Sequence, residues 1–111
     1  MTLLAGCAHA HRPYAHLSAA QAKQCRADGG YESRGGFGEP ICQVRYADGG
    51  KPCLNKSDCL GRCISDAPDR DMRAVAAGTP VSGHCAAEKE IFGCYANVED
   101  GKLVEGYFCD D

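Results

Sequence analysis

The most reactive side chains in this sequence belong to nine cysteines, and their oxidation state decides what chemistry they can do. A catalytic thiolate needs a base beside it. His84 precedes Cys85, but neighbours on an extended chain point to opposite faces. A zinc site would use Cys53, Cys59 and Cys63 with His84 or Cys85. Their C-x5-C-x3-C spacing differs from the paired cysteines of a zinc knuckle. The pattern therefore favours disulfide bonds over nucleophilic or zinc chemistry.

The composition indicates that covalent bonds supply much of the stability. The 111 residues include 14 glycines, 3 phenylalanines, 5 tyrosines and no tryptophan. A core with so few large apolar residues leaves little surplus over the conformational entropy lost on folding. Cytosolic thiols stay reduced, which would leave this core unsupported. We therefore expect an oxidising compartment, namely secreted, periplasmic or cell-surface. A reduced, zinc-binding intracellular protein is the opposing class.

The distribution of charged and apolar residues argues against a nucleic-acid partner and against a membrane-spanning helix. The net charge is -3, with 12 basic and 15 acidic residues that do not cluster. Because no polybasic run appears, we expect no nucleic-acid partner. No window approaches the ~20 consecutive apolar residues that a membrane-spanning helix needs, so we expect no such helix.

The motif Leu-Ala-Gly-Cys ending at Cys7 resembles the lipobox of bacterial lipoproteins. The resemblance implies that Cys7 is acylated and becomes the mature N-terminus. Residues 1–6 are then the remainder of a signal peptide, and 7–16 a lipid-anchored tether. A full signal has a charged segment and roughly 7–15 apolar residues, which we expect to be encoded upstream of Met1. In that family a residue other than Asp after the cysteine, here Ala8, implies an outer-membrane lipoprotein facing the periplasm or the cell surface.

The cysteine count agrees with this interpretation. Once Cys7 is assigned to the lipid, eight cysteines remain, and they pair completely as four bridges. Among about 105 connectivities, we favour one in which the first bridge joins the predicted helix to the first strand and the last closes the terminal hairpin. The favoured pairs are Cys25–Cys42, Cys53–Cys63, Cys59–Cys85 and Cys94–Cys109.

The first half of the chain predicts one helix and one strand. A helix is expected over 17–28, because Ser18 and Gln21 fit a capping box and two glycines follow at its end. Residues 29–40 are glycine-rich and are expected to form a loop. A strand is expected over 41–46, with Cys42, Val44 and Tyr46 on one face and Gln43 and Arg45 on the other.

The end of the chain predicts a β-hairpin around the turn Asp100-Gly101. A two-residue turn sets Cys94 opposite Tyr107, with Cys109 one step along on the same face. Such diagonal neighbours can be bridged if the strand twists or bulges. Together these elements predict a small disulfide-rich α+β fold with one short N-terminal helix, two β-hairpins and long loops. We expect a single disulfide-stapled domain over 17–111.

Three groups of polar residues suggest other chemistry, and none has the required pattern. The histidines lie in the tether and lack a fixed second shell for a metal. The acidic group Asp66, Asp69 and Asp71 has neither the spacing nor the twelfth-position Glu of a calcium-binding loop. For the second acidic group, which runs from Glu88 to Asp100, nothing in the sequence places two carboxylates around a cleft, as hydrolysis would require. We therefore predict no catalytic residue, metal or cofactor. The groups are His9, His11 and His16; Asp66, Asp69 and Asp71; and Glu88, Glu90, Glu99 and Asp100.

The body of the chain resembles, in style, the cysteine-rich extracellular modules of many organisms, through the Cys53-x5-Cys59-x3-Cys63 segment. That resemblance implies a binding or structural role. We therefore predict a non-enzymatic lipoprotein of a bacterial cell envelope that acts as an interaction or structural module for a protein partner. The alternative is an inhibitor or immunity protein against an envelope-targeting hydrolase.

The segment 65–80 is the longest stretch without cysteine inside the framework, and its ends are held near Cys63 and Cys85. Rigid bases with projecting loops are a common way for small scaffolds to present binding residues. Arg70, Met72 and Arg73 are the candidate contacts, because Arg and Met are enriched at interfaces. In the alternative interpretation the loop only connects two halves of the domain.

Overall fold

The computed structural model describes residues 15–67 and 75–110. Cys7 and the loop residues Arg70, Met72 and Arg73 lie outside these ranges. The described residues divide into two compact units, with the boundary between Val44 and Arg45, and the single domain expected over 17–111 spans both. Each of the four disulfides has both of its cysteines in the same unit.

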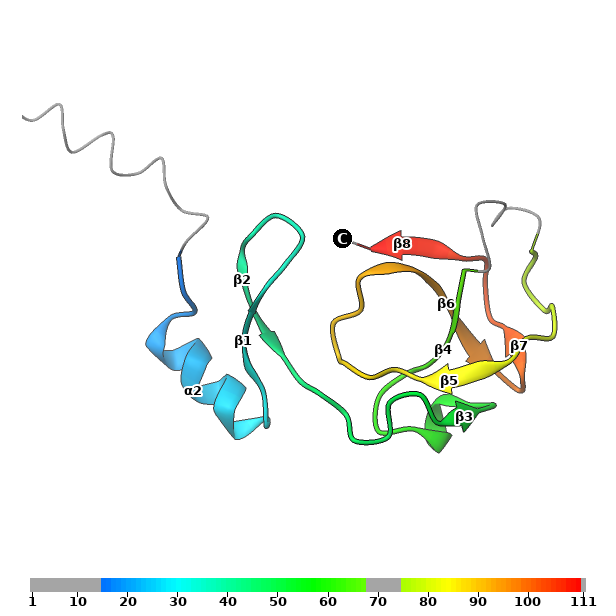
Figure 1. Cartoon of the computed structure of the whole chain (residues 1–111), viewed down its shortest axis with the longest axis horizontal. Helices are drawn as coiled ribbons and strands as arrows, with labels where there is room; N and C mark the ends of the chain where they lie inside the picture. The colour runs from blue at the N-terminus through cyan, green and yellow to red at the C-terminus, as the bar shows by residue number, and fades with distance from the viewer. Residues whose placement is uncertain (1–14, 68–74, 111) are drawn as a thin grey trace, which may run out of the picture. The chain divides into compact units, whose positions relative to one another are not determined.

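The first unit contains helix α2 (Ala19–Ala27) and a hairpin of strands β1 (Tyr31–Arg34) and β2 (Pro40–Gln43) (Figure 1). The predicted capping box is confirmed. The Ser18 hydroxyl accepts a hydrogen bond from the Gln21 amide at 3.1 Å, and the Gln21 side chain accepts one from the Ser18 amide at 3.0 Å. These bonds satisfy backbone donors that have no partner inside the helix.

A disulfide and a glycine join the helix to the hairpin. Cys25 on α2 is buried and bonded to Cys42 on β2, with 5.6 Å between their Cα atoms. Gly30, which follows the helix, lies against this disulfide. A Cβ atom at Gly30 would lie 2.6 Å from the Cys42 sulfur and 2.7 Å from the Gln43 carbonyl oxygen. Only glycine fits this close approach without moving the disulfide.

The loop predicted for this region is wrong, and the predicted strand is confirmed only in part. The expected loop over 29–40 contains strand β1, and the expected strand over 41–46 is β2, which ends at Gln43. Strand β2 ends there because the hairpin ladder runs from Arg34 opposite Pro40 to Tyr31 opposite Gln43 and then has no further partner. The expected alternation puts Gln43 on the face opposite Cys42, and in the structure Gln43 is only 2% exposed. Burial on this short strand depends on what packs against it.

The second unit is built on an antiparallel sheet whose strands follow the order β3-β5-β4-β6-β7, with β8 also paired to β6 (Figure 1). A short 3-10 helix, η2, lies between β3 and β4. The strands and η2 are β3 (Pro52–Cys53), η2 (Lys56–Asp58), β4 (Cys63–Asp66), β5 (Gly83–Cys85), β6 (Gly93–Glu99), β7 (Lys102–Leu103) and β8 (Phe108–Asp110).

In the part of the chain that the structure describes, the small disulfide-rich architecture with one α-helix is confirmed, but two hairpins understate its strand content. Cysteines make up four of the ten buried hydrophobic residues in the described part of the chain. One buried cluster contains Cys53, Cys63, Cys85 and Val98. The second contains Ile64, Ala86 and Tyr95. Disulfides thus replace large apolar side chains in the interior, as the composition leads us to expect.

The terminal hairpin has the predicted turn but a different register. Asp100 and Gly101 both adopt positive φ, 53° and 70°, which a two-residue hairpin turn requires. Beyond the Val98–Leu103 pair, residues 104–107 leave the ladder, and β8 then resumes pairing with β6. Cys94 therefore lies directly opposite Cys109, where uninterrupted pairing would place Tyr107. The bulge makes the bridge a direct cross-strand contact.

Among the described residues, no helix has both the length and the apolar character needed to cross a bilayer.

Candidate functional site

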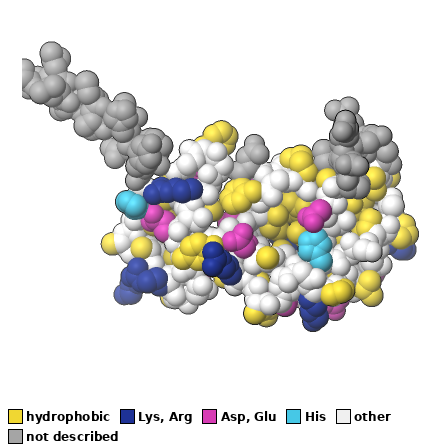
Figure 2. All heavy atoms as spheres, viewed as in Figure 1, with side chains coloured by type: hydrophobic (Ala, Val, Ile, Leu, Met, Phe, Trp, Pro, Cys, Tyr) yellow, Lys and Arg dark blue, Asp and Glu magenta, His cyan; other side chains and the backbone are white. Residues whose placement is uncertain are grey.

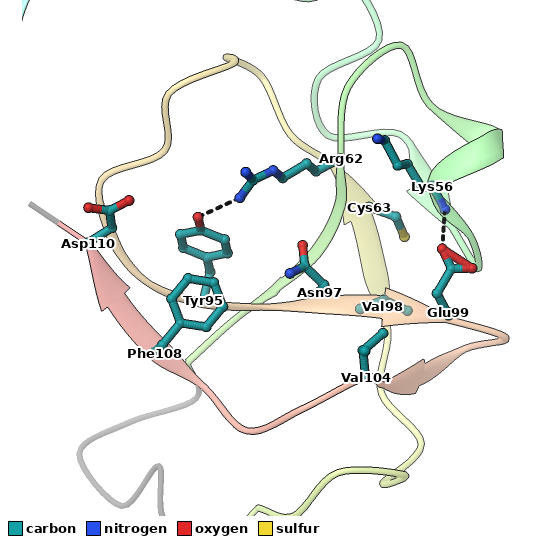
Figure 3. A pocket seen from close by; sticks show the side chains of 10 residues that line it. All are labelled: Lys56, Arg62, Cys63, Tyr95, Asn97, Val98, Glu99, Val104, Phe108 and Asp110. Carbon is teal, nitrogen blue, oxygen red and sulfur yellow. Dashed lines mark hydrogen bonds between the residues drawn. The ribbon is translucent and has the colours of Figure 1, made fainter.

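The candidate site is an open cavity of about 550 Å³ on one face of the second unit's sheet. This volume is within the usual range for ligand pockets. Strand β6 crosses the site, and η2, the start of β4, the 104–107 bulge and β8 surround it (Figure 3). The lining residues are Lys56, Arg62, Cys63, Tyr95, Asn97, Val98, Glu99, Val104, Phe108 and Asp110.

Strand periodicity explains why β6 contributes so many of these side chains. Side chains two positions apart on a strand lie on the same face, which applies to Tyr95, Asn97 and Glu99. The Asn97 carbonyl oxygen accepts a hydrogen bond from the Val104 amide at 3.0 Å. That bond fixes the bulge at the edge of the cavity and leaves the Asn97 side-chain amide among the lining groups (Figure 3).

Arg62 is the basic group most firmly positioned at the cavity. Its Nη1 donates a hydrogen bond to the Tyr95 hydroxyl at 2.7 Å, and its guanidinium carbon lies 6.0 Å from the centre of the Tyr95 ring. The Tyr95 ring in turn packs against Phe108, with 4.6 Å between ring centres. The guanidinium remains exposed while a buried aromatic ring holds it, so little side-chain entropy remains to be lost when it binds a partner.

The opposite side of the cavity is set by the turn that contains η2. The Asp58 carboxylate accepts hydrogen bonds from the amides of Leu54 at 2.9 Å and Asn55 at 3.0 Å, and these bonds lower the pKa of the Asp58 carboxyl. The turn then presents Lys56, whose backbone amide donates to the Glu99 carboxylate at 3.2 Å. This hydrogen bond holds the Glu99 carboxylate in position at the rim of the cavity.

The cavity has a mixed electrostatic character. Lys56 and Arg62 contribute positive charge, whereas Glu99 and Asp110 contribute negative charge. Figure 2 shows the same interspersion over the visible face of the molecule, where basic and acidic side chains alternate with hydrophobic ones. Such a lining suits a partner with groups of both signs, as protein segments have, and it lacks the positive field that a phosphate backbone requires.

The four disulfides in the structure join the same pairs that the sequence favours, Cys25–Cys42, Cys53–Cys63, Cys59–Cys85 and Cys94–Cys109. The sulfurs of the considered zinc ligands Cys53, Cys59 and Cys85 do come within 4.8 Å of one another, but each belongs to a disulfide. Cys85 is fully buried and bonded, and its neighbour His84 instead lies with Nε2 3.6 Å from the Asp66 carboxylate.

The other candidate residues are dispersed. His16 is hydrogen-bonded to Glu32 at 2.6 Å, and this bond lowers the pKa of the Glu32 carboxyl. Of the acidic residues considered for hydrolysis, only Glu99 lines the cavity. Several candidates lie outside the described residues and have no structural account: Cys7, His9, His11, Asp69, Arg70, Asp71, Met72 and Arg73.

Sequence reasoning missed Arg62 and Asn97 as site residues. The alternation along the terminal hairpin does place Tyr95 and Asn97 on one face, so these two of the ten lining residues could be grouped from that pattern. No local signal indicates that Arg62 reaches Tyr95, because 33 positions separate them in the sequence.

Comparisons of this chain with protein-family models, with curated proteins and with solved structures find no match.

Proposed function

We propose that this protein is a non-enzymatic interaction module of a bacterial cell envelope, and that it holds a protein partner in the cavity over β6. The observation that carries this proposal is the arrangement of Arg62, Tyr95 and Asn97 around an open volume of about 550 Å³. Arginine is enriched among the residues that dominate binding energy at interfaces, and the buried Tyr95 holds Arg62 in place. The Asn97 amide adds a donor and an acceptor suited to a peptide backbone.

The partner chemistry follows from the lining. A projecting segment of a protein can place a carboxylate near Arg62 and an amine near Asp110 while its backbone meets Asn97. Complementary charges of both signs give orientation and specificity more than raw affinity. The disulfide-bonded core beneath the cavity keeps the lining in place before binding, which lowers the entropy cost of association.

The second candidate function is an inhibitor or immunity protein against an envelope-targeting hydrolase. It rests on the turn between β1 and β2, where the Phe37 side chain is 87% exposed. The Phe37 amide donates to the Glu39 carboxylate at 2.9 Å, and the Gly35 amide donates to the Glu39 carbonyl oxygen at 2.8 Å. An aromatic side chain on such an ordered turn has the form of a plug for an enzyme's pocket.

The compartment and the anchor belong to the same proposal. Four disulfides support an oxidising environment. The proposed anchor is an acyl group on Cys7, with Ala8 directing the lipoprotein to the outer membrane. When the protein is expressed behind a complete lipoprotein leader, it should partition into detergent and have a diacylglycerol mass, and Cys7→Ser should release it. A wild-type protein that stays soluble and unacylated would contradict this anchor.

Site-specific photo-crosslinking tests which surface binds. A benzophenone amino acid is placed at Val104 in the cavity, Phe37 on the hairpin turn, Met72 in the loop or Ala20 on the exposed helix, and each variant is irradiated in envelope extract. We expect the Val104 probe to capture a protein that the Ala20 control does not. Arg62→Ala should remove this capture, whereas Lys23→Ala should leave it intact.

Each other outcome assigns the function differently. Capture from Phe37 alone, of a hydrolase whose activity falls on binding, would establish the inhibitor function in place of the cavity. Capture from Met72 alone would move the binding surface to the 65–80 loop. Equal capture by Arg62→Ala and the unaltered protein would show that the cavity does not recognise the partner. Thermal melting of each variant confirms that its fold is intact.

A further inference from the structure

Two of the disulfides form a single cluster of sulfur atoms in the core of the second unit. Cys53–Cys63 joins β3 to β4, and Cys59–Cys85 joins the chain after η2 to β5. The sulfurs of Cys53, Cys59 and Cys85 all lie within 4.8 Å of one another, so the two bridges are neighbours in space. In addition, Cys63 and Cys85 are direct partners in the β4–β5 ladder although they are not bonded to each other.

The four cysteines differ sharply in their access to solvent. Cys59 is half-buried. Cys85 is 0% exposed, Cys63 is 2% exposed and Cys53 is 6% exposed. A thiolate from solution attacks the sulfur it can reach, and the other sulfur of that bridge leaves. Attack on this cluster is therefore directed to Cys59, and the leaving sulfur is that of Cys85.

The environment disfavours a thiolate at Cys85. A buried charge without a partner is costly, and burial in apolar surroundings raises the pKa of a thiol. The Cys53 sulfur of the neighbouring bridge lies within 4.8 Å of the Cys85 sulfur. If Cys85 attacks Cys53, the leaving group becomes Cys63, which lies in the wall of the cavity together with Arg62 and Lys56 (Figure 3). Cys63 thus borders an open cavity, whereas Cys85 is not among the residues that line it.

We propose that these two bridges form a thiol–disulfide relay, in which a low-molecular-weight monothiol modifies Cys59 and the reducing equivalent moves to Cys63. In the first step the external thiolate attacks Cys59, a mixed disulfide forms, and the Cys59–Cys85 bond breaks with its electron pair on Cys85. In the second step Cys85 attacks Cys53, a Cys53–Cys85 bond forms, and the Cys53–Cys63 bond breaks with its electron pair on Cys63. The external sulfur ends oxidised as the mixed disulfide, and Cys63 ends reduced.

The sequence makes the relay easy to follow by peptide mapping. Cleavage after Lys and Arg places each of the eight cysteines from Cys25 to Cys109 in a separate peptide. The full-length protein is exposed briefly to reduced glutathione and quenched with acid. It is then unfolded, and its free thiols are alkylated with N-ethylmaleimide at acidic pH, where exchange is slow because thiols are protonated. Digestion without reduction then identifies every bond.

The expected product has glutathione on Cys59, the alkyl group on Cys63, and a Cys53 peptide linked to the Cys85 peptide. Alkylated Cys63 should exceed alkylated Cys85 severalfold. The relay is overturned if the alkyl group is mainly on Cys85 while Cys53–Cys63 stays intact. It is also overturned if glutathione attaches first to Cys53, Cys63 or Cys85, or if this pair of bridges does not react at all.

The chain contains its own control for simple exchange. In the Cys94–Cys109 bridge, Cys109 is exposed and Cys94 is half-buried, and neither belongs to the sulfur cluster. Glutathione on Cys109 should leave the alkyl group on Cys94, with no new pairing. The double variant Cys53→Ser/Cys63→Ser removes the acceptor bridge, so there the alkyl group should stay on Cys85. Mapping of the unaltered protein decides the proposal even if that variant does not fold.

Discussion

Substitution of Gly83 by alanine provides a direct test of the packing around the sulfur core. Gly83 lies on β5 opposite Cys53 in the sheet. A Cβ atom at this position would lie 2.8 Å from the Cys53 carbonyl oxygen, 2.9 Å from the Cys63 sulfur and 3.2 Å from Val98 Cγ1. The first two neighbours are a backbone atom and a disulfide atom, so neither can move away as the end of a flexible side chain could.

The magnitude follows from this crowding. Inserting a methyl group into a well-packed core typically costs about 1–3 kcal/mol, and the rigid neighbours place Gly83→Ala at the upper end. For a unit of this size, each kcal/mol lowers the melting temperature by roughly 4–8 °C. For a cost of about 3 kcal/mol we therefore expect a decrease of roughly 12–24 °C, with the four disulfides still formed.

The matched control is Gly106→Ala. Gly106 is exposed in the 104–107 bulge, and a Cβ atom there would meet nothing within 4 Å. Its free energy of unfolding should change by no more than about 1 kcal/mol, in either direction. Thermal and urea unfolding followed by circular dichroism compares the two variants, and intact mass without reductant checks the disulfides. Equal stability of the two variants would refute the close packing of Gly83 against the bridges.

Three further predictions concern other parts of the molecule. Full reduction should unfold the protein at neutral pH. Each closed loop contributes on the order of 3 kcal/mol, and four such loops match the whole free energy of unfolding of a typical domain, about 5–15 kcal/mol. An unchanged circular dichroism spectrum in strong reductant would contradict this. Ser18→Ala should destabilise helix α2 by about 1 kcal/mol through loss of the cap to Gln21, measured as lower helicity and an earlier helical unfolding transition, with the surface substitution Lys23→Ala as the control. Asp58→Asn should change the pH dependence of stability. The pKa of Asp58 is lowered in the folded protein by the amides of Leu54 and Asn55. Its contribution is therefore present above the pKa of the unfolded state and is lost as the pH falls through the lower, folded-state pKa. Urea titrations across the acidic range should show a smaller loss of stability on acidification for the variant, and parallel curves would exclude this role.

Features that depend on neighbouring residues could be predicted from the sequence. The helix is an example, because Ser18 and Gln21 cap it within a single turn. The type of the terminal turn is another, since Asp100 and Gly101 tolerate positive φ. The first and last cysteine pairs join segments that the predicted helix, strand and hairpin already bring close together. No predicted element brings Cys53 to Cys63 or Cys59 to Cys85, so those two pairs depended on the sheet.

Features that depend on distant partners could not be predicted in this way. Burial of Gln43 could not be read from the sequence, because alternation along a strand shows which side chains share a face but not which face is covered. The register at Cys94 and Cys109 required the 104–107 bulge, whose position and length the alternation along the hairpin does not determine. The candidate site needs Arg62 beside Tyr95, a contact between residues far apart in the chain.

The sequence by itself determined that this protein depends on disulfides, because nine cysteines accompany few large apolar residues. Only the tertiary structure decided how those disulfides are arranged in space. The strand order β3-β5-β4-β6 brings Cys53–Cys63 beside Cys59–Cys85 and places Cys63 in the wall of the cavity. The physical reason is that strand pairing is non-local. Each ladder joins segments whose separation along the chain gives no local signal, and the close approach of the sulfurs exists only once the sheet has formed.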